Sequence, residues 1–358
     1  MSLVFNMVGG GGGIKLTGIA ITKAPTKTTY TQGETFDPAG MVVTATYSNG
    51  AKLTSPSYTF SPAGALTAGD TAITVTYTEG GVTKTATQAI TVIVLTASTS
   101  AAPGVNYTAG LSGLEASDVT AFAEAISNNS GITNATSTVY VDFGDVHRKI
   151  SVGDQVILPL NGTNYAFDVI GFNHDTLTTP TAYGAATATG KAGFTFQMHD
   201  LFGTGFAMND SATNAGGWKS SKMRTSTMVT MKGYMPSAWQ TAIKPVNKLS
   251  GIGGGTSSGT ETVSDDCFLL AEGEIFGPGY GYGGNGYSFD DECAKVAQYA
   301  YYKVGNSKVK NQNGSANNWG ERSPNSGNSD NFCYVNGDGI ASRIRANSTR
   351  GVAFGFCA

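Results

Sequence analysis

Residues 41–50 read MVVTATYSNG, and residues 72–81 read AITVTYTEGG. In both stretches apolar side chains largely alternate with threonine, and a turn sequence, SNG or EGG, follows. A period of two is that of a half-buried β-strand, and these turns are typical of hairpins. Together with QAITVIVL at Gln88–Leu95, they predict short strands from Ile14 to Leu95. Strands of this length and spacing over roughly 80 residues favour a β-sandwich.

The same segment resembles a known class of domain. ITKAPTKTTYTQGETFDPAGMVVTATYSNG at residues 21–50, followed by ITVTYTEGGVTKTATQAITV at residues 73–92, is similar to the bacterial immunoglobulin-like (Ig-like) domains of surface and phage proteins. The resemblance covers nearly all of residues 14–95. It implies a spacer or adhesive module, and it implies no catalysis.

The composition points the same way. Charged residues are only 13% of the chain, well below the usual quarter, and glycine is abundant at 49 residues. This profile is typical of a turn-rich, β-dominated extracellular or particle-surface protein and not of a helical cytosolic enzyme. The net charge of -3 predicts no nucleic-acid partner, and no apolar run is long enough to insert in a membrane.

The first residues, MSLVFNMVGGGGG, lack the basic segment and the full apolar core of a secretory signal, so we expect none. Their glycine run predicts a flexible tether over residues 1–13. Residues 96–136 are expected to be a linker and a short helix. The linker is rich in Ala, Ser, Thr and Gly, and the helix at Leu114–Ser127 has apolar residues at intervals of three and four.

From residue 137 to residue 358 short strands and helices are mixed, so the chain as a whole is expected to be α+β. The expected strands are Ser137–Phe143, Gln155–Leu160, Tyr165–Phe172, Phe194–Met198 and Asp266–Leu270. The expected helices are Trp218–Thr227, Met235–Val246 and Asp291–Tyr302.

A series of elements in this region also resembles a known domain. They are VGDQVILPLNGTNYAFDVIGFNHD, GGWKSSKMR, MPSAWQTAIKPV, DDCFLLAEGEIFG, NNWGERSP and GVAFGF. They are similar to a domain widespread in bacterial and prophage proteins, and the resemblance implies a C-type-lectin-like mixed α/β fold for residues 137–358. The chain departs from that pattern at Gly320-Glu321, where bulkier residues are usual, and at Ala353-Phe354, where Arg-Pro is usual.

The most polar stretch lies close to the C-terminus. Nine asparagines occur between residues 311 and 347, and the sparse apolar residues among and after them, such as Trp319, Phe332 and Phe354, are expected to anchor the loop ends. Asn, Ser, Tyr and Asp supply adaptable hydrogen bonds, as in antibody paratopes. We expect ligand contacts from these residues: Asn313, Asn317, Asn318, Asn325, Asn328, Asn331, Tyr334, Asn336 and Arg343.

The asparagine-rich segment also resembles the variable proteins of diversity-generating retroelements, in which adenine-rich codons near the 3′ end of the gene are mutated. That resemblance implies a variable region at about residues 311–347. It implies a ligand-binding protein on the virion surface of a phage or prophage, possessing a role in host attachment. The implied partners are a bacterial cell-surface protein or glycan and the virion structural proteins. A virion decoration protein without diversified binding is the alternative. A simple polar loop is also open, although the embedded aromatic residues are unusual in a disordered tract.

Enzymatic chemistry is not expected. The four cysteines, Cys267, Cys293, Cys333 and Cys357, form no CxxC pair, and their apolar surroundings predict buried thiols, with disulfides as the alternative. The implied fold also occurs in formylglycine-generating enzymes, which need two reactive cysteines in a polar groove. The aromatic neighbours of these thiols favour burial instead, so an oxidase is the least favoured function.

Other candidates for chemistry are weak, and we expect no metal or other cofactor. His147, His174 and His199 are scattered, and hydrogen bonding in turns is favoured over a His–carboxylate site. The acidic groups near Asp265, Asp290 and Asp338 are too sparse to supply the six to eight oxygens that calcium needs. Tyr280, Tyr282 and Tyr287, in a glycine-rich loop, could stack on a sugar or peptide or simply pack against the asparagine-rich segment.

Overall fold

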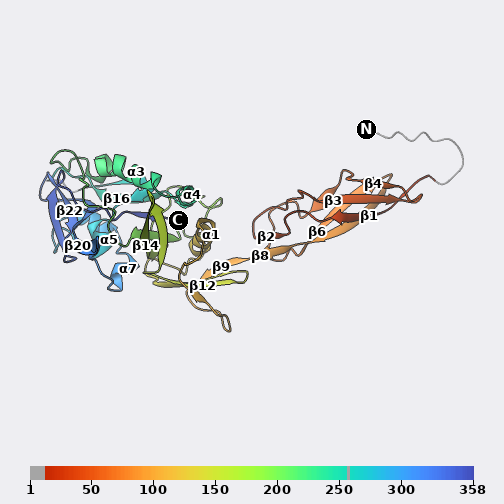
Figure 1. The fold of residues 1–358 in the computed structure, drawn as a ribbon, viewed down its shortest axis with the longest axis horizontal. Helices are drawn as coiled ribbons and strands as arrows, with labels where there is room; N and C mark the ends of the chain where they lie inside the picture. The colour runs from red at the N-terminus through yellow and green to blue at the C-terminus, as the bar shows by residue number, and fades with distance from the viewer. Residues whose placement is uncertain (1–12, 256–258) are drawn as a thin grey trace. The chain divides into compact units, whose positions relative to one another are not determined.

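The computed structural model describes residues 13–255 and 259–358, and the chain divides into two compact units between Leu95 and Thr96 (Figure 1). The expected tether at residues 1–13 lies outside the described residues except for Gly13.

The first unit is an all-β sandwich, as expected. Its strands are β1 (Leu16–Lys23), β2 (Thr29–Thr31), β3 (Val42–Tyr47), β4 (Lys52–Thr54), β5 (Thr59–Ser61), β6 (Ala72–Glu79), β7 (Val82–Ala89) and β8 (Thr91–Ile93). They form the sheets β1-β3-β4 and β5-β6-β7 and the parallel pair β2-β8. The alternating residues of β3 and β6 point inward, so that Val43, Ile73 and Val75 are buried together with Tyr30 and Phe36. The strand expected at residues 88–95 is divided, since β7 ends before the buried Ile90 and β8 begins after it.

Residues 96–136 are not a free linker but part of the second unit. They contribute β10 (Thr108–Ala109), most of β9 (Leu95–Ser98) and helix α1 (Ala116–Ser127). These two strands flank β11 (Thr138–Phe143) and β12 (Val146–Ser151) in a sheet of order β10-β12-β11-β9. The apolar face of α1 explains why this segment is not a free linker, because a helix that buries its apolar side chains must pack on the domain beside it.

A five-stranded sheet lies at the centre of the second unit. Its order is β13-β14-β15-β24-β18, formed by β13 (Gln155–Leu160), β14 (Thr163–Phe172), β15 (Phe194–Met198), β24 (Gly355–Cys357) and β18 (Cys267–Phe268). The C-terminal apolar run of the chain is therefore an interior strand, paired antiparallel with both β15 and β18. Phe196 and Phe356 stack within this sheet, with ring centroids 5.2 Å apart.

Short helices and hairpins complete the second unit. The helices are α2 (Gly217–Ser220), the π-helical η1 (Met223–Met228), α3 (Val229–Gly233), α4 (Ser237–Ala242), α5 (Glu272–Phe276), α6 (Asp290–Lys295) and α7 (Ala300–Lys303). The hairpins are β16 (Val246–Gly251) with β17 (Thr260–Asp265) and β19 (Lys310–Gln312) with β20 (Ser315–Asn317). A three-stranded sheet has the order β21 (Trp319–Pro324), β22 (Asn331–Val335) and β23 (Ala341–Arg345).

The chain is thus mostly β, with few and short helices. The single helix expected at Asp291–Tyr302 is two, because Val296 is extended and Tyr299 turns its buried hydroxyl onto Asp175 at 2.9 Å. No helix in residues 13–255 or 259–358 is both long and apolar enough to cross a membrane.

Candidate ligand-binding surface

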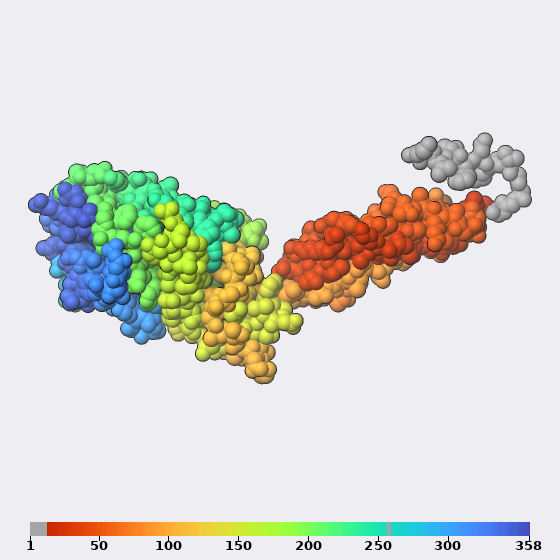
Figure 2. All heavy atoms as spheres, in the orientation of Figure 1, coloured from red at the N-terminus to blue at the C-terminus, as the bar shows by residue number. Residues whose placement is uncertain are grey.

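The segment from Asn311 to Asn347 forms β19 to β23 and their connections, and it lies at one end of the second unit (Figure 2, blue). The expected anchors are in place, since Trp319, Phe332 and Phe354 have no exposed surface. The polar residues between these anchors do not form one patch.

Asn325 was expected to contact a ligand, and this prediction is wrong. Its side chain is only 1% exposed, and its amide donates to the carbonyl of Tyr287 at 2.8 Å. The residue follows directly on the buried strand β21, and a buried amide must be satisfied inside the protein. Asn325 therefore holds two loops together and cannot reach a ligand.

Four other asparagines build turns. Asn313 adopts a left-handed backbone, φ +52°, in the β19–β20 turn, a conformation that asparagine tolerates better than most residues. The Asn336 side chain accepts hydrogen bonds from the backbone N–H groups of residues 338 and 340, Asn318 accepts from Gly337 N–H at 3.0 Å, and Asn317 accepts from its neighbour. Much of the asparagine content near the β22–β23 turn therefore serves the backbone.

The register of β22 and β23 separates two further candidates. Arg343 lies opposite Cys333, and Tyr334 lies opposite Ser342. Because neighbouring residues of a strand point to opposite faces of the sheet, Arg343 and Tyr334 cannot share one surface. Asn328 and Asn331 lie at the far end of β22 from Asn336, so the candidates divide into at least two groups.

Arg343 instead joins the tyrosine-rich loop that connects α5 and α6. Its guanidinium lies over the ring of Tyr287, 4.6 Å from the centroid. Tyr282, in the same loop, is 58% exposed, and its ring lies against Gly327, where a Cβ atom would be 2.8 Å from the ring. We call the surface formed by Tyr282, Tyr287, Gly327, Asn328 and Arg343 the tyrosine surface.

The tyrosine surface is rigidly supported from below. The Glu272 carboxylate accepts hydrogen bonds from the backbone N–H groups of Tyr287, at 2.9 Å, and Ser288, at 2.7 Å. Asp290 accepts from Gly283 N–H at 2.8 Å. Burial, followed by the negative charge of Glu272, raises the pKa of Tyr280, another tyrosine of this loop. A loop whose backbone is held in place in this way can bind a ligand at little cost in ordering the backbone.

Asn214 is a supporting residue that reading the sequence did not identify. Its buried side chain donates to the backbone carbonyls of Asn325, Asn328 and Asn331, at 3.0, 2.7 and 2.7 Å, and accepts from Gly254 N–H. It therefore fixes the course of the loop that carries Gly327 and Asn328. An isolated asparagine more than a hundred residues upstream offers no pattern that would have revealed this role.

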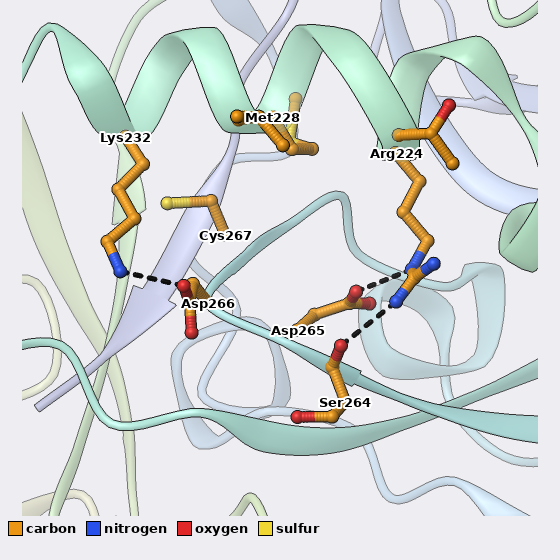
Figure 3. A pocket seen from close by; sticks show the side chains of 9 residues that line it. Arg224, Met228, Lys232, Ser264, Asp265, Asp266 and Cys267 are labelled. Carbon is orange, nitrogen blue, oxygen red and sulfur yellow. Dashed lines mark hydrogen bonds and ion pairs between the residues drawn. The ribbon is translucent and has the colours of Figure 1, made fainter.

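A depression lies between η1–α3 and the residues around Ser264–Cys267, apart from the tyrosine surface (Figure 3). Its cations are already paired, Arg224 with Asp265 at 2.6 Å and Lys232 with Asp266 at 2.7 Å (Figure 3). Arg224 also donates to the Ser264 carbonyl. A ligand would have to displace these partners, so the tyrosine surface is the better candidate.

The remaining candidates have structural roles. The four cysteines are buried and unpaired, which confirms the expected buried thiols over the alternative of disulfides. His199 does not pair with the neighbouring Asp200 but with Asp168, whose carboxylate lies 2.9 Å from Nδ1. His174 stacks on Tyr299 at 3.8 Å.

Comparison with known families finds one match within each unit. Residues 23–92 match the bacterial Ig-like domain (group 3) family. The first unit is therefore a bacterial Ig-like domain, as its sequence predicted. Residues 198–357 match a domain of unknown function, DUF6273, and this match includes every residue of the tyrosine surface. No curated protein matches the chain.

Proposed function

We propose that this chain is a ligand-binding surface protein of a phage or prophage. In this proposal the Ig-like unit is a spacer, and the second unit is a C-type-lectin-like scaffold whose loops bind a protein or glycan on a bacterial cell. The sequence elements quoted above support the choice of scaffold. The low charge and high glycine content support a particle-surface setting.

The observation that carries the proposal is an exposed tyrosine, Tyr282, in the same loop as Tyr287, whose ring lies against the Arg343 guanidinium. Aromatic rings offer flat apolar faces on which sugar rings or peptide side chains stack. A guanidinium adds a planar donor that binds carboxylate or phosphate groups with two hydrogen bonds. Tyrosine and arginine are also the residues that most often dominate binding energy at interfaces.

Diversification is the second part of the proposal. Asn328 and Asn347 are exposed, and both lie outside the buried strands. Substitution there would leave the packed interior unchanged, as a variable region requires. Sequencing the gene in a mixed population tests this part. Adenine-limited substitution confined to the 3′ end is expected, whereas a uniform sequence would favour a decoration protein.

Binding of the labelled full chain to a panel of bacterial strains tests recognition itself. We expect Tyr282→Ala and Arg343→Ala each to weaken binding about 30-fold, the loss typical of a residue that dominates an interface. Val229→Ala, at a 66% exposed position on α3, is the control and should bind as the wild type does. Protease or periodate treatment of the cells distinguishes a protein ligand from a glycan. Unchanged binding of both tyrosine-surface variants would reject the proposed site.

A further inference from the structure

Three potential metal ligands meet beneath the tyrosine surface. Glu272 lies in α5, Glu321 in β21 and Cys333 in β22, and one ligand atom from each lies within 4.8 Å of the other two. All three side chains have no exposed surface. The topology creates this meeting point, because β21 and β22 are paired and Glu272 N–H donates to Ser323 Oγ of β21 at 2.9 Å.

Glu321 is the unusual member of this triad. Neither of its carboxylate oxygens has a hydrogen-bond partner among residues 13–255 and 259–358. An ionised carboxylate without a partner is among the most costly groups to bury. Glu272, by contrast, accepts the backbone N–H groups of the tyrosine loop. Those bonds orient the Glu272 carboxylate and leave lone pairs for another partner.

The neighbouring arginines do not satisfy Glu321. Arg322 directs its guanidinium to Glu274, at 2.5 and 2.8 Å, and to two backbone carbonyls. Arg350 donates through Nη2 to the carbonyls of Arg345 and Ser348, while its buried Nε and Nη1 have no partner among the described residues. A dication would therefore complete a balanced set of charges: three anionic ligands, two positive charges on the ion and one on Arg350.

We propose that Glu272, Glu321 and Cys333 bind a divalent transition-metal ion, with Zn²⁺ the best fit. A thiolate excludes the hard cations Ca²⁺ and Mg²⁺ as the natural occupant, and two carboxylates disfavour Cu⁺. Zinc accepts sulfur and oxygen together, with bonds of ~2.3 and ~2.1 Å. Ligand atoms on one such ion lie roughly 3.5 Å apart, so the ligand atoms, which lie within 4.8 Å of one another, need to approach by about 1.3 Å at most.

The ion would have a structural role. It would join α5, β21 and β22 directly under the loop that carries Tyr287, and so stiffen the tyrosine surface. The three ligand groups are buried and do not contact any external ligand, so this inference does not depend on the proposed function. The protein could bind zinc without recognising a bacterial cell, and the converse also holds.

Metal analysis of the full chain, purified under reducing conditions, tests the inference. After removal of metal with a chelator and titration with Zn²⁺, we expect about one zinc ion per chain to remain through gel filtration. Zinc at about a hundredfold excess over Kd should raise the Tm of the second unit by roughly 5 °C or more. Glu321→Gln and Cys333→Ser should each weaken zinc binding at least about 100-fold. Cys267→Ser, at a buried thiol outside the triad, should bind zinc as the wild type does.

Cobalt substitution of the wild-type protein provides a readout that does not depend on how the variants fold. A thiolate ligand produces a near-ultraviolet sulfur-to-cobalt charge-transfer band, and Cys333→Ser should abolish it. Failure of the wild type to retain zinc or to show this band would overturn the inference. Equal zinc binding by the wild type, Glu321→Gln and Cys333→Ser would also overturn it.

Discussion

Replacing Arg322 with methionine is expected to destabilise the second unit by at least about 5 kcal/mol. The guanidinium is fully buried and bonds both oxygens of Glu274 and the carbonyls of Leu249 and Leu269. Glu274 in turn accepts from Lys248 at 2.8 Å. Removing one partner of a buried ion pair costs about 3–5 kcal/mol, and each carbonyl left without a donor adds about 1 kcal/mol.

Tryptophan fluorescence isolates the relevant transition. The three tryptophans of the chain, Trp218, Trp239 and Trp319, all lie in the second unit, so their emission reports its unfolding and not that of the Ig-like unit. For a domain of this size, a loss of about 5 kcal/mol corresponds to a Tm lower by roughly 10–20 °C. Chemical unfolding in guanidinium chloride measures the free energy directly.

The same substitution in an exposed ion pair is the control. Arg345 lies 3.5 Å from Asp330 with 70% of its side chain exposed, so Arg345→Met should change the free energy of unfolding by less than about 0.5 kcal/mol. A double-mutant cycle of Arg322→Met with Glu274→Gln should give a coupling energy above about 1.5 kcal/mol. If Arg322→Met lowers the free energy of unfolding no more than Arg345→Met does, the buried ion pairs do not stabilise this unit.

The buried ion pairs of Glu274 with Arg322 and Lys248 also predict how the stability of the protein changes in acid. Burial opposes ionisation of Glu274, but the positive charges of Arg322 and Lys248 prevail and hold its pKa at about 2. Because this pKa lies below the ordinary value of 4.5, the stabilisation is complete above about pH 4.5 and is lost as the pH falls towards 2. Arg322→Met should therefore move the midpoint of acid unfolding to higher pH.

Three further substitutions test separate parts of the second unit. The hydrogen bond to Asp168 raises the pKa of His199 above 6.5. The resulting stabilisation, below about 1 kcal/mol at this half-exposed site, is present below pH 6.5 and is lost as the pH rises through the folded pKa. His199→Gln should remove this pH dependence of Tm in thermal melts recorded between about pH 5 and pH 9. Asn214→Ala leaves three carbonyls without their donor and should cost about 3 kcal/mol in guanidinium unfolding, with faster hydrogen exchange in the loop that it supports. Gly193→Ala places a Cβ atom 2.0 Å from a backbone oxygen of α1 and should cost more than about 3 kcal/mol, whereas Gly205→Ala, with open space around it, should be close to neutral.

The sequence predicted correctly those strands whose position follows from the alternation of apolar and polar residues. The alternation in residues 41–47 predicted β3 to within one residue, and Gln155–Leu160 is β13 as expected. The helix at Asp291–Tyr302 was wrong because a tertiary contact prevailed over helical periodicity: Tyr299 turns inward to a buried carboxylate. Periodicity carries no information about such a contact, since Asp175 lies far away in the chain.

The asparagine-rich segment shows why composition alone was a poor guide to the site. Asparagine is common both in adaptable binding surfaces and in turns that need a left-handed backbone or a side-chain acceptor. Asn313, Asn318 and Asn336 meet the second need, and the buried Asn325 meets neither. The residue type alone does not tell whether an asparagine binds a ligand or stabilises a turn, whereas the register of the strands shows which side chains share a face.

What the register leaves for recognition is a smaller and more aromatic surface than the sequence predicted. Arg343 was among the expected contacts, but its neighbour Tyr287, like the exposed Tyr282, comes from a loop outside the asparagine-rich segment. That loop is held by Glu272, and the strands below it carry Glu321 and Cys333. If a variable region is to change without unfolding the domain, its constant support must lie beneath it and must not depend on the residues that change. Asn214 and Glu272 meet that requirement, because both lie outside residues 311–347 and their hydrogen bonds to the loops use backbone groups and not the side chain of Asn328 or Arg343.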